Sequence, residues 1–485
     1  MLNKTNFNSF LILIRLFSII LSIIGVSMIL PLSVAFFYKE TSVISSFLIP
    51  FSVSLIFGIT GLFSIKKTPF QLGTRTVFFF VSFSWIVISV FGAVPLYLSG
   101  FFPSFLDAFF ESVSGFSTTG ATVLAEIDSL PRSINLWRME MHWLGGMGII
   151  ALTTAILPLL GTDGFQLVKA ESTGPEKGKI TPKMANTAKA LWTIYLSLTI
   201  LQTVLLIFCK MDFVDALGHA FSTLGTGGFS SKTASLQGFN SLSAEIVCTI
   251  FMFLAGVNFS LYYFLITKKF DQIKKNSELK AYAIIFFTVI LLLTFTLIEF
   301  YGGFGKALRY ASFQVASIMS TTGFATADFR AWPSSSQFLL FLLFLIGACS
   351  GSTAGGLKVI RVVILSKAAK VQMLKMLHPH GIFSVRINKE NCRNDLVMNV
   401  AAFTFVYALL TLITTFIGTL GGLEVFQAFT ASLSMLGNIG PAFGPFFDYG
   451  WIPSFVKFWY CFMMIAGRLE IYNLIIFFIA DFWKK

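Results

Sequence analysis

A short glycine-terminated motif occurs four times in this chain of 485 residues, and it constrains the fold more than any other feature. Each copy contains small or hydroxyl-bearing residues before its last glycine, follows a short apolar segment and precedes a long one. The copies span residues 116–122, 225–229, 320–324 and 437–441. Spacings of 108, 95 and 117 residues separate their last glycines, which are Gly120, Gly228, Gly323 and Gly440. Four units of similar length, each with one such loop, predict a ring of four loops around one axis.

The composition indicates a membrane protein. Hydrophobic residues make up 55% of the chain and charged residues 12%, with a mean hydropathy of +0.81. Many apolar runs reach the length of about 20 residues that crosses a bilayer as a helix. The first run, 10–38, is too long for the hydrophobic part of a signal peptide and lacks a cleavage site, so we expect it to remain as a membrane helix.

The apolar runs follow a regular order. After a helical pair at 10–38 and 43–65, each glycine motif is preceded by a long run and a short one and is followed by another long run. The short runs, at 105–116, 213–224, 306–319 and 424–436, cannot cross a hydrocarbon core of about 30 Å as helices. We therefore expect an all-α membrane protein with ten transmembrane helices. Four tandem helix–pore-loop–helix repeats would form a pseudo-four-fold arrangement around one central pore, preceded by an extra N-terminal helical pair.

The expected long runs after that pair are 76–101, 137–160, 191–208, 244–266, 282–300, 337–365, 396–417 and 455–482. The corresponding units are an N-terminal two-helix unit at 1–70, pore repeats at 71–165, 186–270, 277–370 and 396–485, and a cytoplasmic basic linker at 371–395.

The positive charges fix an expected orientation. The net charge is +13, and 21 of the 35 lysines and arginines lie in the four connections 66–75, 161–189, 267–280 and 358–393. The segments around the glycine motifs instead carry Asp107, Glu111, Glu126, Asp128, Asp212, Asp215, Glu424 and Asp448. By the positive-inside rule the basic connections and both termini are cytoplasmic, and the glycine loops open outward. The positive charge is thus explained by topology, and we expect no nucleic acid partner.

The glycine loops have the chemistry of an ion-selectivity filter. A cation that enters a bilayer loses water, and rings of backbone carbonyls replace that water for K⁺. Glycine permits the backbone angles that aim successive carbonyls at one axis, and a preceding short helix directs the negative end of its dipole at the ion. The expected K⁺ ligands and shaping glycines are Thr118, Thr119, Gly120, Thr226, Gly227, Gly228, Thr321, Thr322, Gly323, Asn438, Ile439 and Gly440. The alternative is that these loops are small-residue packing sites between helices.

The run 337–365 is interrupted by four glycines within residues 347–356. Such a sequence breaks a helix, and irregular backbone at membrane depth has to face water or protein. Because the break follows the third glycine loop, we expect an intramembrane gate beneath the filter, although close helix packing is an alternative. The expected gate residues are Gly347, Ser350, Gly351, Ser352, Thr353, Gly355 and Gly356, together with Arg468.

Arg468 lies inside the last apolar run, where a buried charge is expensive and usually functional. Below the filter it would repel cations and form a barrier; the alternative is a salt bridge, for which Glu470 is a poor partner because residues two apart on a helix do not face each other. Arg138, Glu140 and His142, at the start of another long run, are expected to form an interfacial cluster rather than a catalytic one.

Metal and cofactor signals are weak. Five cysteines occur without a framework spacing or a CxxC pair. His378 and His380 lie close together but lack cysteine or carboxylate partners, so solvation is more plausible than a metal site. We expect no cofactor bound by this chain, and K⁺ as its transported ion.

The chain resembles the Trk/Ktr/HKT superfamily of K⁺ transporters over its whole length. The resemblance rests on the four repeats, the filter glycines and the segments 143–148 (WLGGMG) and 351–358 (GSTAGGLK). The extra N-terminal pair is similar to that of the TrkH branch rather than the shorter KtrB branch. The resemblance implies a homodimeric pore subunit in a bacterial cytoplasmic membrane, opened by a cytosolic TrkA-like ring of nucleotide-binding domains. The chain itself has no Walker A signature and no GxGxxG after a strand, so nucleotide control would come from outside.

Three functions compete at this point. The first is K⁺ uptake through a gated pore, and the second is a K⁺ symporter coupled to H⁺ or Na⁺. Coupling normally uses a carboxylate or a broken-helix ion site within the membrane, and Asp and Glu within the runs are nearly absent apart from Glu470 and Asp481. That scarcity favours the pore. The third, a membrane enzyme, would need a nucleophile–base or metal constellation inside the runs, and the sequence contains none.

Overall fold

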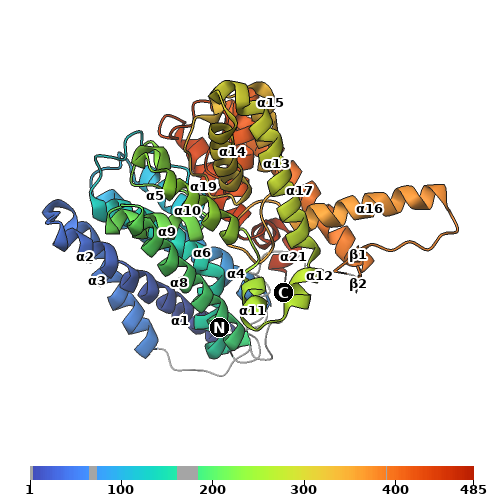
Figure 1. Cartoon of the computed structure of the whole chain (residues 1–485). Coiled ribbons are helices and arrows are strands. Elements are labelled where there is room, and N and C mark those ends of the chain that lie inside the picture. Colours follow the sequence, from blue (N-terminus) through green and yellow to red (C-terminus); the bar gives the residue numbers. More distant parts are fainter. Residues whose placement is uncertain (1–3, 65–73, 161–183, 389, 485) are drawn as a thin grey trace.

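The computed structural model describes residues 4–64, 74–160, 184–388 and 390–484, and it is a bundle of helices (Figure 1). The first three helices, α1 (Lys4–Ser27), α2 (Ile29–Phe37) and α3 (Thr41–Ser64), lie at one side of the bundle. α1 and α3 approach closely because Gly58 and Gly61 leave room for Ser18 and Ser22 of α1. Small residues at such crossings allow helices to pack without a driving force from water.

Four units of similar design follow. The first contains α4 (Thr74–Leu98), α5 (Phe105–Phe116) and α6 (Arg132–Leu160). The second contains α8 (Met184–Phe208), α9 (Phe213–Leu224), α10 (Leu242–Ala255) and α11 (Phe259–Ile266). The third contains α12 (Phe270–Lys275), α13 (Ser277–Tyr301), α14 (Phe304–Met319), α15 (Ser334–Phe344) and α16 (Val359–Leu377). The fourth contains α17 (Asn394–Leu420), α18 (Val425–Gly437), α19 (Ser454–Arg468), α20 (Tyr472–Ile475) and α21 (Ala480–Trp483).

The predicted order of long and short elements is confirmed. Six helical segments are long and apolar enough to cross a membrane, and two bent pairs, α10 with α11 and α19 with the segment after it, add two more. α6, with 29 residues, and α15, a shorter apolar helix followed by an irregular segment at 345–358, lie at the positions of the two remaining predicted crossings. The short elements α5 and α9 have the predicted bounds to the residue.

Two predicted continuous helices are wrong, whereas the first run is confirmed as one span, Leu11–Phe37, with a local irregularity between α1 and α2. Pro31, in the first turn of α2, has no N–H to donate to the preceding turn. The run 244–266 bends by 93° at residues 256–258, where the Asn258 side chain caps α11 by accepting a hydrogen bond from the Ser260 N–H. The run 455–482 bends by 117° after α19, where Glu470 and Ile471 have positive φ angles.

The basic segment 371–395 contains regular structure. It includes the end of α16, which projects from the bundle, and a two-stranded antiparallel hairpin of β1 (Arg386–Ile387) and β2 (Glu390–Asn391) (Figure 1). An apolar cluster holds the hairpin against α16 and α17; its buried members are Ile360, Ile364, Val385, Ile387 and Val400. The basic connections 66–75 and 161–189 lie mostly outside the described residues.

The long helices carry their exposed side chains outward, as a lipid-facing surface requires. Large hydrophobic side chains are more than 60% exposed at Phe63, Ile284, Phe287, Phe405 and Phe416. By contrast, the last seven residues of each of the short helices α5, α9, α14 and α18 are buried. The four short helices therefore form the interior of the bundle.

The four units close into a ring through one repeated contact: the second long helix of each unit packs on the short helix of the next. The contacting pairs are α6 with α9, α10 with α14, α15 with α18 and, closing the ring, α19 with α5. At the closing contact the Lys457 ammonium lies 2.6 Å from an Asp107 carboxylate oxygen and also donates to the Gly450 carbonyl. This ion pair is largely buried, with side chains 8% and 12% exposed.

We predict that Lys457→Ala lowers the free energy of unfolding by about 3 kcal/mol, because it leaves the Asp107 carboxylate buried without its counter-ion. The measurement is the temperature at which the detergent-solubilised protein leaves its folded peak in size-exclusion chromatography. Lys484→Ala is the matched control, since Lys484 and Asp481 form a pair that is 72% and 78% exposed and such pairs add little stability. Equal melting of Lys457→Ala and the wild type would show that the closing contact does not depend on this pair.

Candidate selectivity filter and gate

The four glycine motifs share one backbone conformation. The residue two before the glycine is left-handed in every copy, with φ of 58° at Thr118, 56° at Thr226, 56° at Thr321 and 53° at Asn438. The glycine itself also has positive φ: 80° at Gly120, 82° at Gly228, 84° at Gly323 and 96° at Gly440. Non-glycine residues adopt this region at a cost of roughly 1–3 kcal/mol and usually at functional sites. Its repetition at matching positions shows four copies of one structural element.

A repeated backbone hydrogen bond holds each loop in this conformation. The N–H of the residue before the glycine donates to the carbonyl of a serine five residues earlier, at 2.8–2.9 Å. The serines are Ser114, Ser222, Ser317 and Ser434, one near the end of each short helix. This serine precedes the filter glycine by six residues in all four repeats, a signal that is visible in the sequence and that our sequence analysis missed.

The four loops form a closed ring. A Cβ atom added to each filter glycine would lie within 2.5 Å of a carbonyl oxygen in the neighbouring repeat. These clashes follow the order of the chain: Gly120 meets Gly227, Gly228 meets Thr322, Gly323 meets Ile439, and Gly440 meets Thr119. Only glycine fits at such an approach. The structure thus brings the twelve predicted filter residues together, and the four carbonyls just before the glycines belong to one ring.

Glycines of the long helices also allow close approach to the filter. A Cβ at Gly145 of α6 would overlap the Phe116 carbonyl, and one at Gly467 of α19 would overlap the Leu436 carbonyl. Both carbonyls lie at the end of a short helix, directly before a filter loop. The absence of side chains at Gly145 and Gly467 therefore sets how near α6 and α19 stand to the filter.

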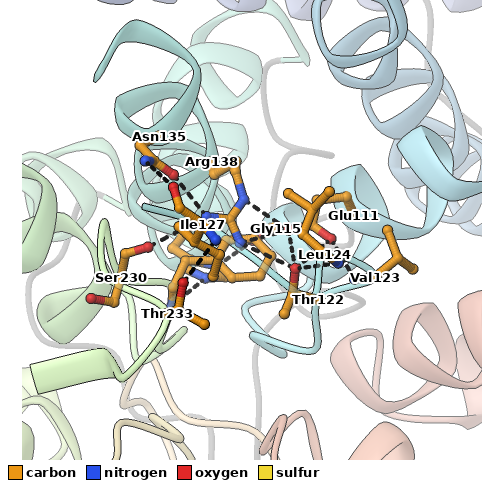
Figure 2. Close-up of polar contacts among 12 residues, drawn as sticks. Glu111, Gly115, Thr122, Val123, Leu124, Ile127, Asn135, Arg138, Ser230 and Thr233 are labelled. Carbon is orange, nitrogen blue, oxygen red and sulfur yellow. Dashed lines mark hydrogen bonds and ion pairs between the residues drawn. The ribbon is translucent and has the colours of Figure 1, made fainter. Parts of the chain in front are cut away.

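The prediction that Arg138, Glu140 and His142 form an interfacial cluster is wrong, because all three are buried. Arg138 and His142 lie one helical turn apart on α6 and face the filter. His142 Nδ1 is 2.8 Å from the Gly115 carbonyl, and its Nε2 accepts a hydrogen bond from the Phe229 N–H at 3.1 Å. Arg138 forms an ion pair with Glu111, as Figure 2 shows. Their spacing of four residues on one helix face was the available signal.

Several acidic residues predicted at the outer mouth are engaged in ion pairs. Asp107 pairs with Lys457, Glu111 with Arg138, Asp128 with Lys232 and Asp212 with Arg132. The hydrogen bond from the Thr233 hydroxyl lowers the pKa of Asp128, which joins the outer loops of the first two repeats. These carboxylates brace the loops and present less free negative charge to the solvent than the sequence suggests.

The predicted gate segment lies against the filter. Residues 345–358 leave the helical conformation between α15 and α16, and every predicted gate residue lies on this segment or on α19. The Gly355 N–H donates to the Thr321 hydroxyl at 2.8 Å, and a Cβ at Gly355 would overlap the Gly437 carbonyl. The segment therefore contacts the loops of the third and fourth repeats.

The same segment interlocks with the bend in the second repeat. The Cys349 N–H donates to the Gly256 carbonyl, and the Phe259 N–H donates to the Gly351 carbonyl, both at 3.0 Å. Gly351 and Gly356 have φ of 69° and 68°. Glycine adopts these backbone angles without the strain that other residues would incur. Irregular backbone thus finds its hydrogen-bond partners in another irregular stretch.

Glu278 was not predicted as a site residue, and it fastens the gate segment to α13. Its Oε1 accepts hydrogen bonds from the Ser350 N–H at 2.6 Å and the Ile360 N–H at 3.1 Å, and its Oε2 accepts from the Ser350 hydroxyl at 2.8 Å. This buried carboxylate bonds to both sides of the helix break. Only its place at the first turn of an apolar run would have marked it in the sequence.

Arg468 joins the gate segment to the first repeat. Its guanidinium donates to the Thr353 carbonyl at 2.6 Å and to the Gly145 carbonyl at 2.8 Å. The side chain is 3% exposed. Arg468 and Glu470 also line a pocket beside the gate segment with Lys358 and Arg361, the latter contacting the Glu470 carboxylate. Three basic groups and one carboxylate give this pocket a net positive charge.

No metal centre accompanies this arrangement: within the described ranges, no three His, Cys, Asp or Glu side chains gather in a way that could hold a metal ion.

Comparisons with known proteins agree with the geometry. The family model described as "TrkH: Cation transport protein" matches residues 43–302 and 303–485. The "Trk system potassium uptake protein TrkH" of Halomonas elongata is 34% identical over 480 residues, covering 98% of this chain and 99% of that protein. The TrkH of Escherichia coli K12 is 35% identical over 479 residues, with 97% and 99% covered. The "Crystal Structure of the Potassium Transporter TrkH from Vibrio parahaemolyticus" covers 99% of this chain and 100% of its own, with 33% identity and a TM-score of 0.88.

These matches confirm the predicted fold class and the predicted resemblance, and they place the chain among transport proteins rather than enzymes. Matches that extend over nearly the whole length of both chains leave no large part of the fold unaccounted for. The protein is a multi-pass membrane protein that belongs to the TrkH family of cation transport proteins.

Proposed function

We propose that this protein conducts K⁺ into the cell through a gated pore whose selectivity filter is the ring of four glycine loops. The observation that carries the proposal is the closed ring itself: four loops with one backbone conformation, each in contact with the next. The relatives from Halomonas elongata and Escherichia coli that are described above are named potassium uptake proteins. A ring of inward carbonyls is the known means of replacing the hydration shell of K⁺.

The filter would work through its backbone. The carbonyls of Thr119, Gly227, Thr322 and Ile439 supply one layer of ligands, and those of Thr118, Thr226, Thr321 and Asn438 supply the layer before it. The glycines shape the loop. The four short helices end directly before these loops, so the negative ends of their dipoles favour a cation there. Side-chain hydroxyls are not shared by all four repeats and cannot carry the selectivity.

The gate would consist of the segment 345–358 and Arg468. The segment contacts two filter loops, and Arg468 ties it to α6. A guanidinium near the ion path repels cations, and the positive pocket beside it adds to the barrier. Opening requires the segment to leave the filter loops and Arg468 to leave the Thr353 carbonyl.

The expected setting of the pore is a homodimer in the bacterial cytoplasmic membrane, with both termini and the basic connections in the cytoplasm. The name "Trk system" of the relatives fits a system with several components. The projecting α16 and its hairpin carry part of the basic sequence (Figure 1). This face would meet the cytosolic TrkA-like nucleotide-binding ring that opens the pore.

One observation bears on the alternative, a symporter coupled to H⁺ or Na⁺. Oε2 of Glu140, on α6, is buried without a hydrogen-bond partner, although the sequence suggested few carboxylates within the spans. A buried carboxylate of this kind is a candidate proton carrier.

We predict that Glu140→Gln leaves K⁺ transport and its response to a pH gradient unchanged, because the pore mechanism assigns no proton to this side chain. The measurement is ⁸⁶Rb⁺ uptake by proteoliposomes with and without an imposed pH gradient. Wild-type uptake that rises with the proton gradient, and loses this dependence in Glu140→Gln, would favour the symporter instead.

We predict that Gly228→Ala abolishes transport while the protein remains folded. A left-handed alanine costs roughly 1–3 kcal/mol and its Cβ displaces the Thr322 carbonyl, so ⁸⁶Rb⁺ uptake should fall at least about tenfold. Gly305→Ala is the matched control, since nothing lies within 4 Å of a Cβ at that position. The proposed function fails if wild-type proteoliposomes take up no more ⁸⁶Rb⁺ than empty ones, and the filter assignment fails if Gly228→Ala transports normally.

We predict that Arg468→Ala raises ⁸⁶Rb⁺ uptake in the absence of any cytosolic partner. The substitution removes both the positive charge and the two hydrogen bonds that hold the gate segment. Arg393→Ala is a control that removes an arginine whose ion pair with Asp395 is exposed and lies outside the gate segment. Unchanged uptake by Arg468→Ala would show that this side chain is structural and not a barrier.

A further inference from the structure

The filter loops differ in how they are tied to the short helices behind them. In each repeat the residue nine positions before the filter glycine lies on the short helix, and the residue two positions after it lies where the loop leaves the filter. The first pair is Glu111 and Thr122, the second His219 and Ser230, the third Gln314 and Ala325, and the fourth Ala431 and Ala442. The four loops have the same backbone conformation, but the side chains at these paired positions differ between the repeats.

In the first repeat Glu111 holds the exit of the loop directly (Figure 2). Its carboxylate accepts a hydrogen bond from the Thr122 hydroxyl at 2.9 Å and another from the Val123 N–H at 2.9 Å. Arg138 of α6 completes the site, with Nε at 2.8 Å from Glu111 Oε1. Both side chains are fully buried.

Arg138 also reaches the second repeat. Its guanidinium donates to the Ser230 carbonyl at 3.4 Å and to the Asn135 side chain at 3.0 Å, as Figure 2 shows. Its Cζ lies 4.3 Å from the centre of the Phe229 ring. Phe229 and Ser230 directly follow the second filter glycine. One guanidinium therefore contacts the exits of two neighbouring filter loops.

The second repeat has a neutral version of the same support. His219 Nε2 lies 2.9 Å from the Ser230 hydroxyl, and its Nδ1 lies 2.7 Å from the Asp215 carbonyl. The His219 imidazole thus links the short helix α9 to the loop exit, as the Glu111 carboxylate does for α5 in the first repeat.

The third and fourth repeats lack a polar pair at these two positions and use neutral hydrogen bonds at other positions: the Ser317 hydroxyl of α14 donates to the Phe324 carbonyl at 2.6 Å, and the Phe443 N–H donates to the Thr430 hydroxyl of α18 at 3.3 Å. Gln314 is 1% exposed, and both its amide nitrogen and its amide oxygen are buried without a hydrogen-bond partner. Ala325, at the position that corresponds to Thr122 and Ser230, has no polar side chain to pair with it. Ala431 and Ala442 offer no polar group at all. The gate segment contacts the loops of these same two repeats.

We propose that the Glu111–Arg138 ion pair is a positioning element that sets cation selectivity by fixing the exits of the first two filter loops. This inference rests on the proposed filter function and adds residues to it that touch no ion. Na⁺ is smaller than K⁺, so a loop that can move inward accommodates Na⁺ better than a fixed one. A buried, charge-assisted contact, in which two guanidinium nitrogens bind one carboxylate oxygen, resists such movement more strongly than neutral hydrogen bonds do.

The test compares the uptake of ²²Na⁺ and ⁸⁶Rb⁺ by proteoliposomes that contain the full-length protein. Arg138→Lys keeps the charge but loses the planar fork, and Glu111→Gln keeps the shape but loses the charge. We expect the ratio of Na⁺ to Rb⁺ uptake to rise roughly fivefold or more in each, a size typical of coupling within one hydrogen-bond network. Gln314→Met is the matched control at the equivalent position of the third repeat, and its ratio should stay at the wild-type value.

The outcomes separate the two proposals. Absence of Rb⁺ uptake by the wild type contradicts the proposed function. Normal wild-type uptake with an unchanged ratio in both variants, or with both fluxes reduced by one common factor, overturns the positioning role and leaves the pair a merely structural one. An equal rise of the ratio in Gln314→Met also overturns it. A single substitution can prevent folding because it leaves one buried charge. In that case the double variant Glu111→Gln with Arg138→Gln removes both charges, and its ratio of Na⁺ to Rb⁺ uptake is compared with that of the wild type.

Discussion

Irregular backbone inside a bilayer has to find all of its hydrogen bonds within the protein, and this requirement shapes the whole molecule. Each filter loop meets it through the hydrogen bond to a serine carbonyl at the end of a short helix, and each short helix is enclosed by long helices on all sides. The gate segment meets it by bonding to the bend at 256–258 and to the Glu278 carboxylate. The filter loops thus satisfy this hydrogen bond within their own repeat, whereas the gate segment also depends on the neighbouring second repeat.

The long helix after each filter loop shows how one design has diverged between repeats. In the first repeat α6 is continuous and places Gly145 against the end of α5. In the second repeat the helix bends at 256–258, in the third it opens into the gate segment, and in the fourth it turns sharply after Arg468. The irregular parts contact one another: the gate segment bonds to the second repeat, and Arg468 bonds to the gate segment and to α6. Movement of the gate segment thus requires adjustment in every other repeat.

The fold class could be predicted from the sequence because membrane helices need long apolar runs and the filter loops need glycine. Both requirements are visible in short stretches of sequence. The bounds of α5 and α9 followed from apolar length alone. The bends at Asn258 and Glu470 were missed because each depends on a few residues within a uniformly apolar run. The four glycine loops were located through their glycines, whereas Glu111, Arg138 and Glu278 were missed or misread. A charged residue near the end of an apolar run looks interfacial in the sequence, and only tertiary contacts show that its partner lies in another element.

The asymmetry of the supports has a consequence for how the filter and the gate act together. A buried ion pair holds the exit of the first loop and contacts that of the second, while the gate segment contacts the loops of the other two repeats, which neutral hydrogen bonds support. Asn438 joins the two halves, because its side-chain amide donates to the Thr119 hydroxyl of the first loop and to the Met464 carbonyl of α19. α19 ends at Arg468, which bonds to the gate segment. Any displacement of Arg468 that moves α19 is therefore transmitted to the fourth loop, and through Asn438 to the first, whose exit is fixed. Movement of the gate segment therefore acts most directly on the third and fourth loops, whose side-chain supports are neutral hydrogen bonds such as Ser317 to the Phe324 carbonyl and Tyr449 to the Gly440 carbonyl.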